Sequence, residues 1–101
     1  ICDILSYLNN NISEDLNVDK IAMIFYLSKA HLMRKFKKHT GYSIHNYILQ
    51  KRLHKASQLI KDGDNITSAA LNSGFNDYSA FSRSFKKLYQ LSPKEFQQKN
   101  S

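Results

Sequence analysis

Residues 17–38 and 65–87 are two copies of one short unit, and this duplication limits the fold more than any other feature of the sequence. The first parts of the copies align at a constant offset of 48, and one extra residue, Asn76, then changes the offset to 49. The matched pairs include Asn17/Asn65, Ala22/Ala70, Leu32/Phe81, Arg34/Arg83, Phe36/Phe85 and Lys37/Lys86. A repeated unit of this length predicts two equivalent supersecondary structures.

The spacing of apolar residues predicts helices along the whole chain. Apolar residues recur at helical spacing, and no segment alternates apolar and polar residues as a half-buried strand would. The predicted helices cover residues 3–11, 18–25, 29–39, 44–61, 66–73 and 78–89, and a last short helix starts at Ser92–Pro93. The residues expected to cap their N-termini are Asn17, Ser28, Ser43, Asn65, Asp77 and Ser92. We therefore predict an all-α fold of seven helices.

Each copy contains two short helices joined by a tight turn, which is the pattern of a helix-turn-helix unit. In the second copy the turn contains Gly74, which can adopt a positive φ without steric cost. The first copy has Tyr26 at this position, where a left-handed backbone would cost on the order of 1 kcal/mol. We expect the first turn to be either strained or differently shaped.

The helix between the two copies is long enough to act as a spacer. Its 18 residues would span about 27 Å, which is compatible with two groove-binding helices about 34 Å apart once the flanking units are added. The predicted organisation is a first helix-turn-helix subdomain at 1–42, a linker helix at 43–62 and a second subdomain at 63–101.

Positive charge is concentrated in the middle of the chain. The sequence has 15 Lys and Arg against 8 Asp and Glu, for a net charge of +7. No acidic residue lies between Asp19 and Asp62, a stretch that holds ten basic residues. Such a stretch attracts polyanions because neutralised phosphates release condensed counterions. Charge alone would also fit an ordinary solvated surface, but the duplicated unit favours a nucleic acid.

The residue types needed for catalysis or for a cofactor do not form a recognisable pattern. The four histidines lack the spacing of metal ligands, and the single cysteine, Cys2, excludes an intrachain disulfide and a cysteine-based zinc site. Three glycines provide no phosphate-binding loop. We expect neither an enzyme nor a cofactor. No apolar run approaches about 18 residues, so we expect no membrane span.

The second helix of each copy has an apolar face and a polar face. Leu32 and Phe36 in the first copy, and Phe81, Phe85 and Leu88 in the second, are expected to point inward. The expected outward residues are Lys29, Ala30, Met33, Arg34 and Lys37 in the first copy and Tyr78, Ser79, Ser82, Arg83 and Lys86 in the second. Arginine can bond two acceptors of guanine, and lysines at the far end of such a helix suit backbone phosphates.

These residues together resemble the DNA-binding domain of the AraC/XylS family of bacterial transcription regulators. The resemblance covers essentially the whole chain. It includes Leu27-Ser28-x2-His31-Leu32-x-Arg34-x-Phe36-Lys37, Gly74-Phe75-x5-Phe81-x-Arg83-x-Phe85-Lys86-Lys87 and Ser92-Pro93-x2-Phe96. It implies two helix-turn-helix subdomains bridged by a long helix, whose third and sixth helices enter adjacent major-groove segments of double-stranded DNA.

The resemblance also implies roles for individual residues. The base-reading positions would be Ala30, Met33, Arg34, Tyr78, Ser79, Ser82 and Arg83. The phosphate-binding residues would be Lys29, Lys37, Lys38, Lys86 and Lys87. Tyr26 replaces the usual turn glycine, and Ala30 leaves a common contact position without a long side chain, so weaker base readout is expected from the first unit.

The family further implies an activator that contacts RNA polymerase in the bacterial cytoplasm, at the nucleoid. Members usually carry a separate effector-binding or dimerisation domain, and the start of this chain without methionine predicts a fragment from which it is absent. The competing hypothesis is a basic helical module that binds RNA or a protein. It would explain the charge but not the duplicated unit.

Overall fold

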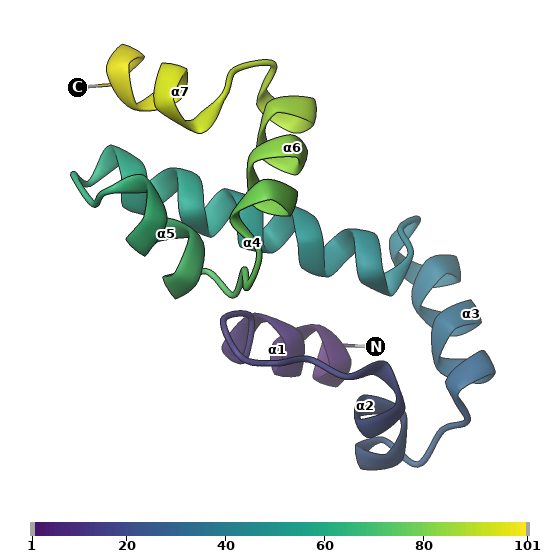
Figure 1. Ribbon diagram of the computed structural model, residues 1–101. Helices are drawn as coiled ribbons and strands as arrows, with labels where there is room; N and C mark the ends of the chain where they lie inside the picture. The colour runs from purple at the N-terminus through teal and green to yellow at the C-terminus, as the bar shows by residue number, and fades with distance from the viewer. Residues whose placement is uncertain (1, 101) are drawn as a thin grey trace. The chain divides into compact units, whose positions relative to one another are not determined.

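The computed structural model describes residues 2–100, and these form seven helices and no strand (Figure 1). The helices are α1 (Cys2–Asn10), α2 (Val18–Ile24), α3 (Lys29–Thr40), α4 (Ile44–Lys61), α5 (Ile66–Asn72), α6 (Tyr78–Tyr89) and α7 (Pro93–Lys99). The all-α prediction is confirmed, and the helix ends lie within one residue of those predicted.

The expected polar residues cap the helices after α1. Ser28 Oγ accepts a hydrogen bond from the His31 amide at 3.1 Å, and Ser43 Oγ accepts one from the Asn46 amide at 3.1 Å. Asn17, Asn65, Asp77 and Ser92 accept equivalent bonds at the starts of α2, α5, α6 and α7. These bonds satisfy amides that have no partner inside the helix, which is why short polar residues specify the helix starts.

The start of α7 is a complete capping box. The Glu95 amide donates to Ser92 Oγ at 3.1 Å, and Glu95 Oε1 accepts from the Ser92 amide at 3.0 Å. The pKa of the Glu95 carboxyl is lowered, first by the bond from the Ser92 amide, then by the Ser92 hydroxyl and the charge of Lys86. The box therefore holds the carboxylate in its ionised form.

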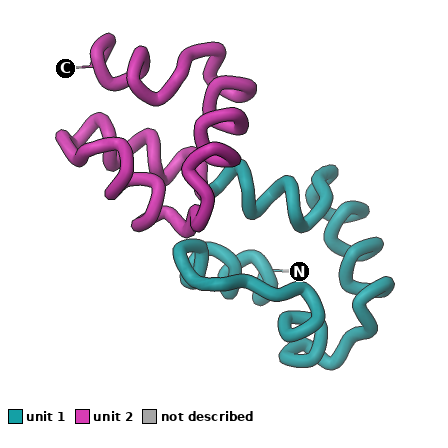
Figure 2. Tube along the Cα trace, in the orientation of Figure 1, with its two compact units in different colours: residues 1–51 teal, residues 52–101 magenta. Residues whose placement is uncertain are grey.

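The chain divides into two compact units, unit 1 at residues 1–51 and unit 2 at residues 52–101 (Figure 2). The boundary lies inside α4, so this helix contributes its first half to one unit and its second half to the other. Each unit contains one helix-turn-helix pair, α2–α3 or α5–α6. The predicted division into a first subdomain at 1–42, a linker helix at 43–62 and a second subdomain at 63–101 stays a prediction.

Unit 1 has a core of aliphatic side chains around one aromatic ring. Its members come from α1 to the first half of α4 and are Ile4, Leu8, Ile12, Val18, Ile21, Ala22, Leu32, Phe36, Ile44 and Ile48. The ring of Tyr47 packs edge-on against Phe36 at 5.3 Å between centroids. Burial of Leu32 and Phe36 confirms the inward face predicted for α3 and leaves its opposite face to solvent.

Unit 2 has a core of stacked aromatic rings. Phe85 is fully buried, and its ring lies 5.6 Å from Phe81, 4.6 Å from Tyr89 and 5.2 Å from Phe96. The prediction that Leu88 points inward is wrong, because Leu88 is 44% exposed and Tyr89 packs beside Phe85 in its place. The Tyr89 hydroxyl also lies 3.5 Å from Ser57 Oγ of α4.

The two turns have the same shape although their sequences differ. Tyr26 has a φ of +58° and Gly74 has a φ of +102°, so both are left-handed. The Leu27 amide donates to the Ala22 carbonyl at 2.8 Å, and the equivalent Phe75 amide donates to Ala70 at 3.0 Å. Of the two expectations for Tyr26, strain is confirmed and a different turn shape is wrong.

We expect Tyr26→Gly to raise the free energy of unfolding by roughly 0.5–1 kcal/mol. The left-handed penalty of about 1–2 kcal/mol disappears, and the greater freedom of glycine in the unfolded chain offsets about 0.4–1 kcal/mol of this gain. The Tyr26 side chain is 96% exposed, so little packing is lost. Chemical denaturation followed by circular dichroism measures the change. Gly74→Ala is the matched variant and should destabilise; a loss of stability for Tyr26→Gly would contradict the argument.

Candidate nucleic-acid interface

In unit 1 the exposed face of α3 is the candidate interface. The helix turns by about 100° per residue, so Arg34, midway in sequence between the buried Leu32 and Phe36, points away from the core. Ala30 and Lys37 flank it and are also exposed. The Ser28 cap fixes the start of the helix and leaves these side chains in solvent.

In unit 2 the exposed face of α6 has the same arrangement. Arg83 lies opposite the buried Phe81 and Phe85, as Arg34 does in α3. Ser79 is exposed, and its amide donates to the capping Asp77 carboxylate at 3.0 Å. Tyr78 is 48% exposed because one side of its ring packs against Phe81 at 5.9 Å between centroids.

The predicted site residues fall into two groups by accessibility. Exposed residues are Ala30, Arg34, Tyr78, Ser79, Arg83 and the five lysines Lys29, Lys37, Lys38, Lys86 and Lys87. Met33 and Ser82 are half-buried, and Met33 packs against the core of unit 1. Only part of the Met33 side chain is thus available to a ligand. The predicted residues of the first copy all lie on α3, and those of the second copy all lie on α6.

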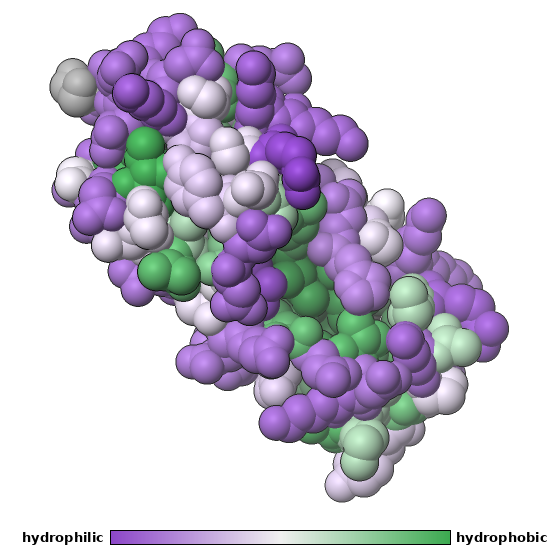
Figure 3. Space-filling model, viewed as in Figure 1, coloured by the Kyte–Doolittle hydropathy of each residue, from purple (hydrophilic) through white to green (hydrophobic). Residues whose placement is uncertain are grey.

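The two arginines are available for an external acceptor. Within residues 2–100 neither Arg34 nor Arg83 forms an ion pair with a carboxylate. Hydrophilic side chains cover most of the visible surface of the molecule (Figure 3). A guanidinium without an internal partner keeps its fork of donors free for two acceptors of a base or for a phosphate.

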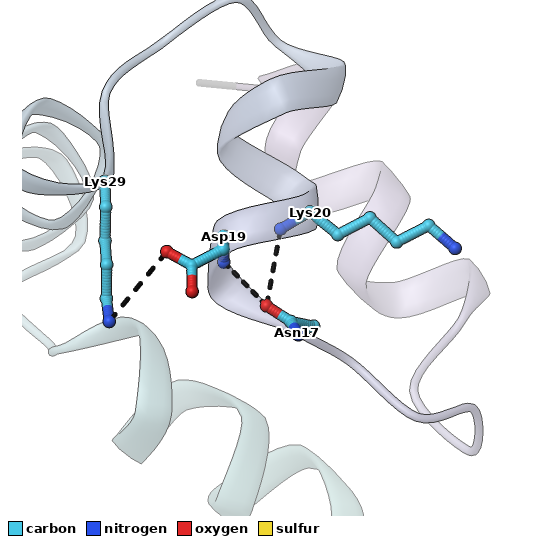
Figure 4. A network of polar contacts seen from close by, with 4 residues as sticks. All are labelled: Asn17, Asp19, Lys20 and Lys29. Atoms are coloured by element: carbon cyan, nitrogen blue, oxygen red, sulfur yellow. Dashed lines mark hydrogen bonds and ion pairs between the residues drawn. The ribbon is translucent and has the colours of Figure 1, made fainter.

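Lys29, one of the predicted phosphate-binding lysines, forms an ion pair with a carboxylate of α2. Its Nζ lies 3.9 Å from Asp19 Oδ1, and both side chains are more than half exposed (Figure 4). Asp19 belongs to the start of α2, where its amide donates to Asn17 Oδ1 at 2.8 Å. An exposed pair of this kind is worth at most about 1 kcal/mol, so a phosphate can compete for Lys29.

Three residues beside Arg34 were not among the predicted site residues. His31, Lys35 and His39 lie one turn apart on α3 and line an open hollow together with Arg34 and Lys38. The signal that could have revealed them is their spacing of four residues, which places them along one side of a helix. None of the three was assigned a role.

The part of the chain that the structure describes holds no grouping suited to a metal. No three His, Cys, Asp or Glu residues within 2–100 lie close enough together to hold an ion. Cys2 is exposed and has no disulfide. No helix among these residues is long and apolar enough to cross a bilayer.

Comparison with known proteins places the chain in a family. A family profile described as a helix-turn-helix domain matches residues 21–99. The multiple antibiotic resistance protein MarA of Escherichia coli is 30% identical over 101 residues, which cover 99% of this chain and 80% of MarA. The transcriptional activator RhaS of an Enterobacter species is 32% identical over 96 residues, which cover 94% of this chain and 34% of RhaS.

A solved structure agrees with these matches. A transcriptional regulator of Chromobacterium violaceum, described as containing an AraC-type DNA-binding domain, superposes with a TM-score of 0.87 at 29% identity, covering 99% of this chain and 90% of that one. Several curated relatives are much longer, and the chain spans only 28% to 54% of five of them. The profile match over most of the chain, together with MarA and the AraC-type structure, shows that the chain belongs to the AraC/XylS family of helix-turn-helix DNA-binding transcription regulators.

Proposed function

We propose that this chain binds specific DNA sequences by inserting α3 and α6 into adjacent segments of the major groove. The observation that carries the proposal is the duplicated exposed face, in which Arg34 and Arg83 lie at equivalent positions opposite the buried apolar side of their helices. A major groove admits one α-helix, and arginine makes the commonest specific contact with guanine.

The contacts divide into base-reading and phosphate-binding ones. The proposed base-reading residues are Ala30, Met33, Arg34, Tyr78, Ser79, Ser82 and Arg83. Lys29, Lys37, Lys38, Lys86 and Lys87 would neutralise phosphates at the edges of the groove. Ala30 offers a base only a methyl group and Met33 is only partly exposed, so we infer that the second unit discriminates sequences more strongly.

A role in transcription activation would belong to the whole protein and not to the DNA-binding domain alone. We infer that the parent protein activates transcription through RNA polymerase in the bacterial cytoplasm. RhaS, which shares this domain, is described as an activator and is about three times as long as the matched region. A further effector-binding or dimerisation domain in the parent protein would explain how the DNA-binding unit is controlled.

Selection from a random duplex library, followed by footprinting of the winning sequence, tests the proposal. We expect a preferred duplex with two protected major-groove segments. Duplex RNA of the same sequence should compete poorly, because the major groove of A-form RNA is too deep and narrow for a helix. Equal competition by RNA would favour a general basic module, and the absence of any preferred duplex would contradict sequence-specific binding.

We expect Lys86→Ala to weaken binding to the selected duplex and to a random duplex by the same factor. A lysine on a phosphate contributes through counterion release, which does not depend on base sequence. The slope of log affinity against log salt should become less steep by about 1. Fluorescence anisotropy over a series of salt concentrations measures both quantities. A loss confined to the selected duplex would make Lys86 a base-reading residue.

A further inference from the structure

Three apolar side chains at the end of α2 and in the turn after it are exposed to solvent. Met23 is 76% exposed, Ile24 is 42% exposed and Tyr26 is 96% exposed. They are three of the seven large hydrophobic residues that are exposed within residues 2–100, and they lie within four consecutive positions. Single exposed apolar residues are normal, whereas grouped ones mark contact sites. We refer to these three residues as the α2 patch.

A lysine without an internal partner borders the α2 patch. Ile21 and Ala22 are buried in the core of unit 1, so at about 100° per residue Met23 and Lys20 lie on the opposite side of α2. They are three residues apart and therefore neighbours on the helix surface. Figure 4 shows the Lys20 side chain extending away from Asp19, and within residues 2–100 its ammonium has no ion pair.

Unit 2 does not repeat this surface. The offset of 48 gives the pairs Lys20/Ser68, Met23/Leu71, Ile24/Asn72 and Tyr26/Gly74. Only the first-copy methionine and its partner leucine are both apolar and exposed. The two turns have the same left-handed conformation, and both helix pairs are formed. The fold therefore does not require the larger apolar side chains and the lysine of the first copy.

Neither its backbone nor its packing favours a tyrosine at position 26. Its φ of +58° is a conformation that residues with a side chain disfavour. Within residues 2–100 its side chain forms no hydrogen bond and no ring contact. Backbone strain of this kind is concentrated at functional sites, where it is part of how a surface works. The combination of strain and exposure indicates a contact made outside the domain.

The size and charge of the α2 patch decide what can cover it. Even at about 250 Å² each, the upper range for an aromatic side chain, three side chains present less than the roughly 800 Å² per partner of a standard interface. A second copy would also bring together two chains that each carry a net charge of +7. A short segment that combines apolar side chains with carboxylates fits both the small area and the free lysine.

We propose that the α2 patch binds a short, acidic, amphipathic segment of a partner protein. Apolar side chains of the segment pack on Met23, Ile24 and the ring of Tyr26, and one of its carboxylates pairs with Lys20. A few apolar and aromatic side chains carry most of the binding energy in such a contact. The inference does not rest on the proposed function, because none of these residues is among the proposed DNA contacts.

Selection from a displayed library of random peptides tests the inference. The wild-type chain is the bait, and Met23→Gln/Ile24→Gln serves for counter-selection. Both chains have the same net charge, so this step removes peptides that bind only the basic surface. We expect the retained peptides to combine Asp or Glu with large apolar residues and to bind the double variant at least about tenfold more weakly in fluorescence anisotropy. Leu71→Gln, at the equivalent position of unit 2, is the matched control and should bind them as the wild type does.

Lys20→Gln tests the part played by charge. We expect it to weaken the retained peptides by roughly two- to fivefold, the effect of one exposed ion pair. Replacing the acidic residues of a peptide by their amides should remove this difference between the two chains. Affinity of Met23→Gln/Ile24→Gln for a random-sequence DNA duplex should equal that of the wild type, which separates the α2 patch from the DNA-binding faces.

Several outcomes would overturn the inference. They are an empty library after counter-selection, retained peptides without acidic residues, and an equal loss of affinity for Leu71→Gln. A dimer of the wild type in analytical ultracentrifugation that is absent in the double variant would assign the α2 patch to a second copy, and a loss of affinity for random DNA would assign it to DNA. Tyr26→Gly, which is expected to be more stable than the wild type, repeats the comparison if the double variant loses its helical signal.

Discussion

Replacing Phe85 by alanine is expected to lower the free energy of unfolding by about 3–5 kcal/mol, which is the usual cost of truncating a buried phenylalanine. Phe85 has no exposed surface and contacts the rings of Phe81, Tyr89 and Phe96 from α6 and α7. Its loss would leave a cavity where these two helices meet. Chemical denaturation followed by circular dichroism measures the change.

Leu88→Ala provides the matched control. Leu88 lies on the same helix but is 44% exposed, so its truncation should change stability by no more than about 0.5 kcal/mol. Alanine is the best helix former, so helix propensity does not destabilise either variant, and a loss of stability reports lost packing. A loss below about 1 kcal/mol for Phe85→Ala would show that the ring cluster does not hold unit 2 together.

Arg83→Ala is expected to weaken binding to the selected duplex by about 1–3 kcal/mol and to relax the preference at one base pair. The guanidinium lies at the centre of the exposed face of α6 and has no ion pair within residues 2–100. A bidentate contact with guanine would therefore be lost without any change in the core. Anisotropy with the selected duplex and with its single-base variants measures both effects.

Arg34→Ala is the matched variant in the first copy. We expect it to cost less than Arg83→Ala, because its neighbours Ala30 and Met33 offer few polar contacts to a base. Equal losses on selected and random duplexes for Arg83→Ala would instead make that arginine a phosphate contact. A larger loss for Arg34→Ala would show that the first unit carries the sequence preference.

Local patterning predicted the helices and their ends because the interactions that specify them are local. A cap such as Ser28 bonds an amide three residues away, and a left-handed residue such as Gly41 ends α3 through a bond to the Lys37 carbonyl. The apolar spacing of Leu32 and Phe36 likewise identified the buried face of α3. None of these features needs knowledge of distant residues.

Two features were not fixed by local patterning: which of two neighbouring side chains of α6 is buried, and which conformation the first turn adopts. Leu88 and Tyr89 follow Phe85 on opposite sides of the same helix face, and Tyr89 turns inward because Phe96 of α7 and Ser57 of α4 receive it. Tyr26 adopts a left-handed conformation as Gly74 does, although its residue type disfavours it, and in each copy the two helices joined by the turn contact each other.

Periodicity and capping act over a few residues, so the amino-acid sequence was enough to predict two capped helix pairs, each with an aromatic residue inside and an arginine outside. The accessible parts of Met33 and Lys35, and the set of α3 side chains that line the hollow, became known from the folded chain. Accessibility depends on the neighbours that each side chain meets after folding, and those neighbours come from other helices.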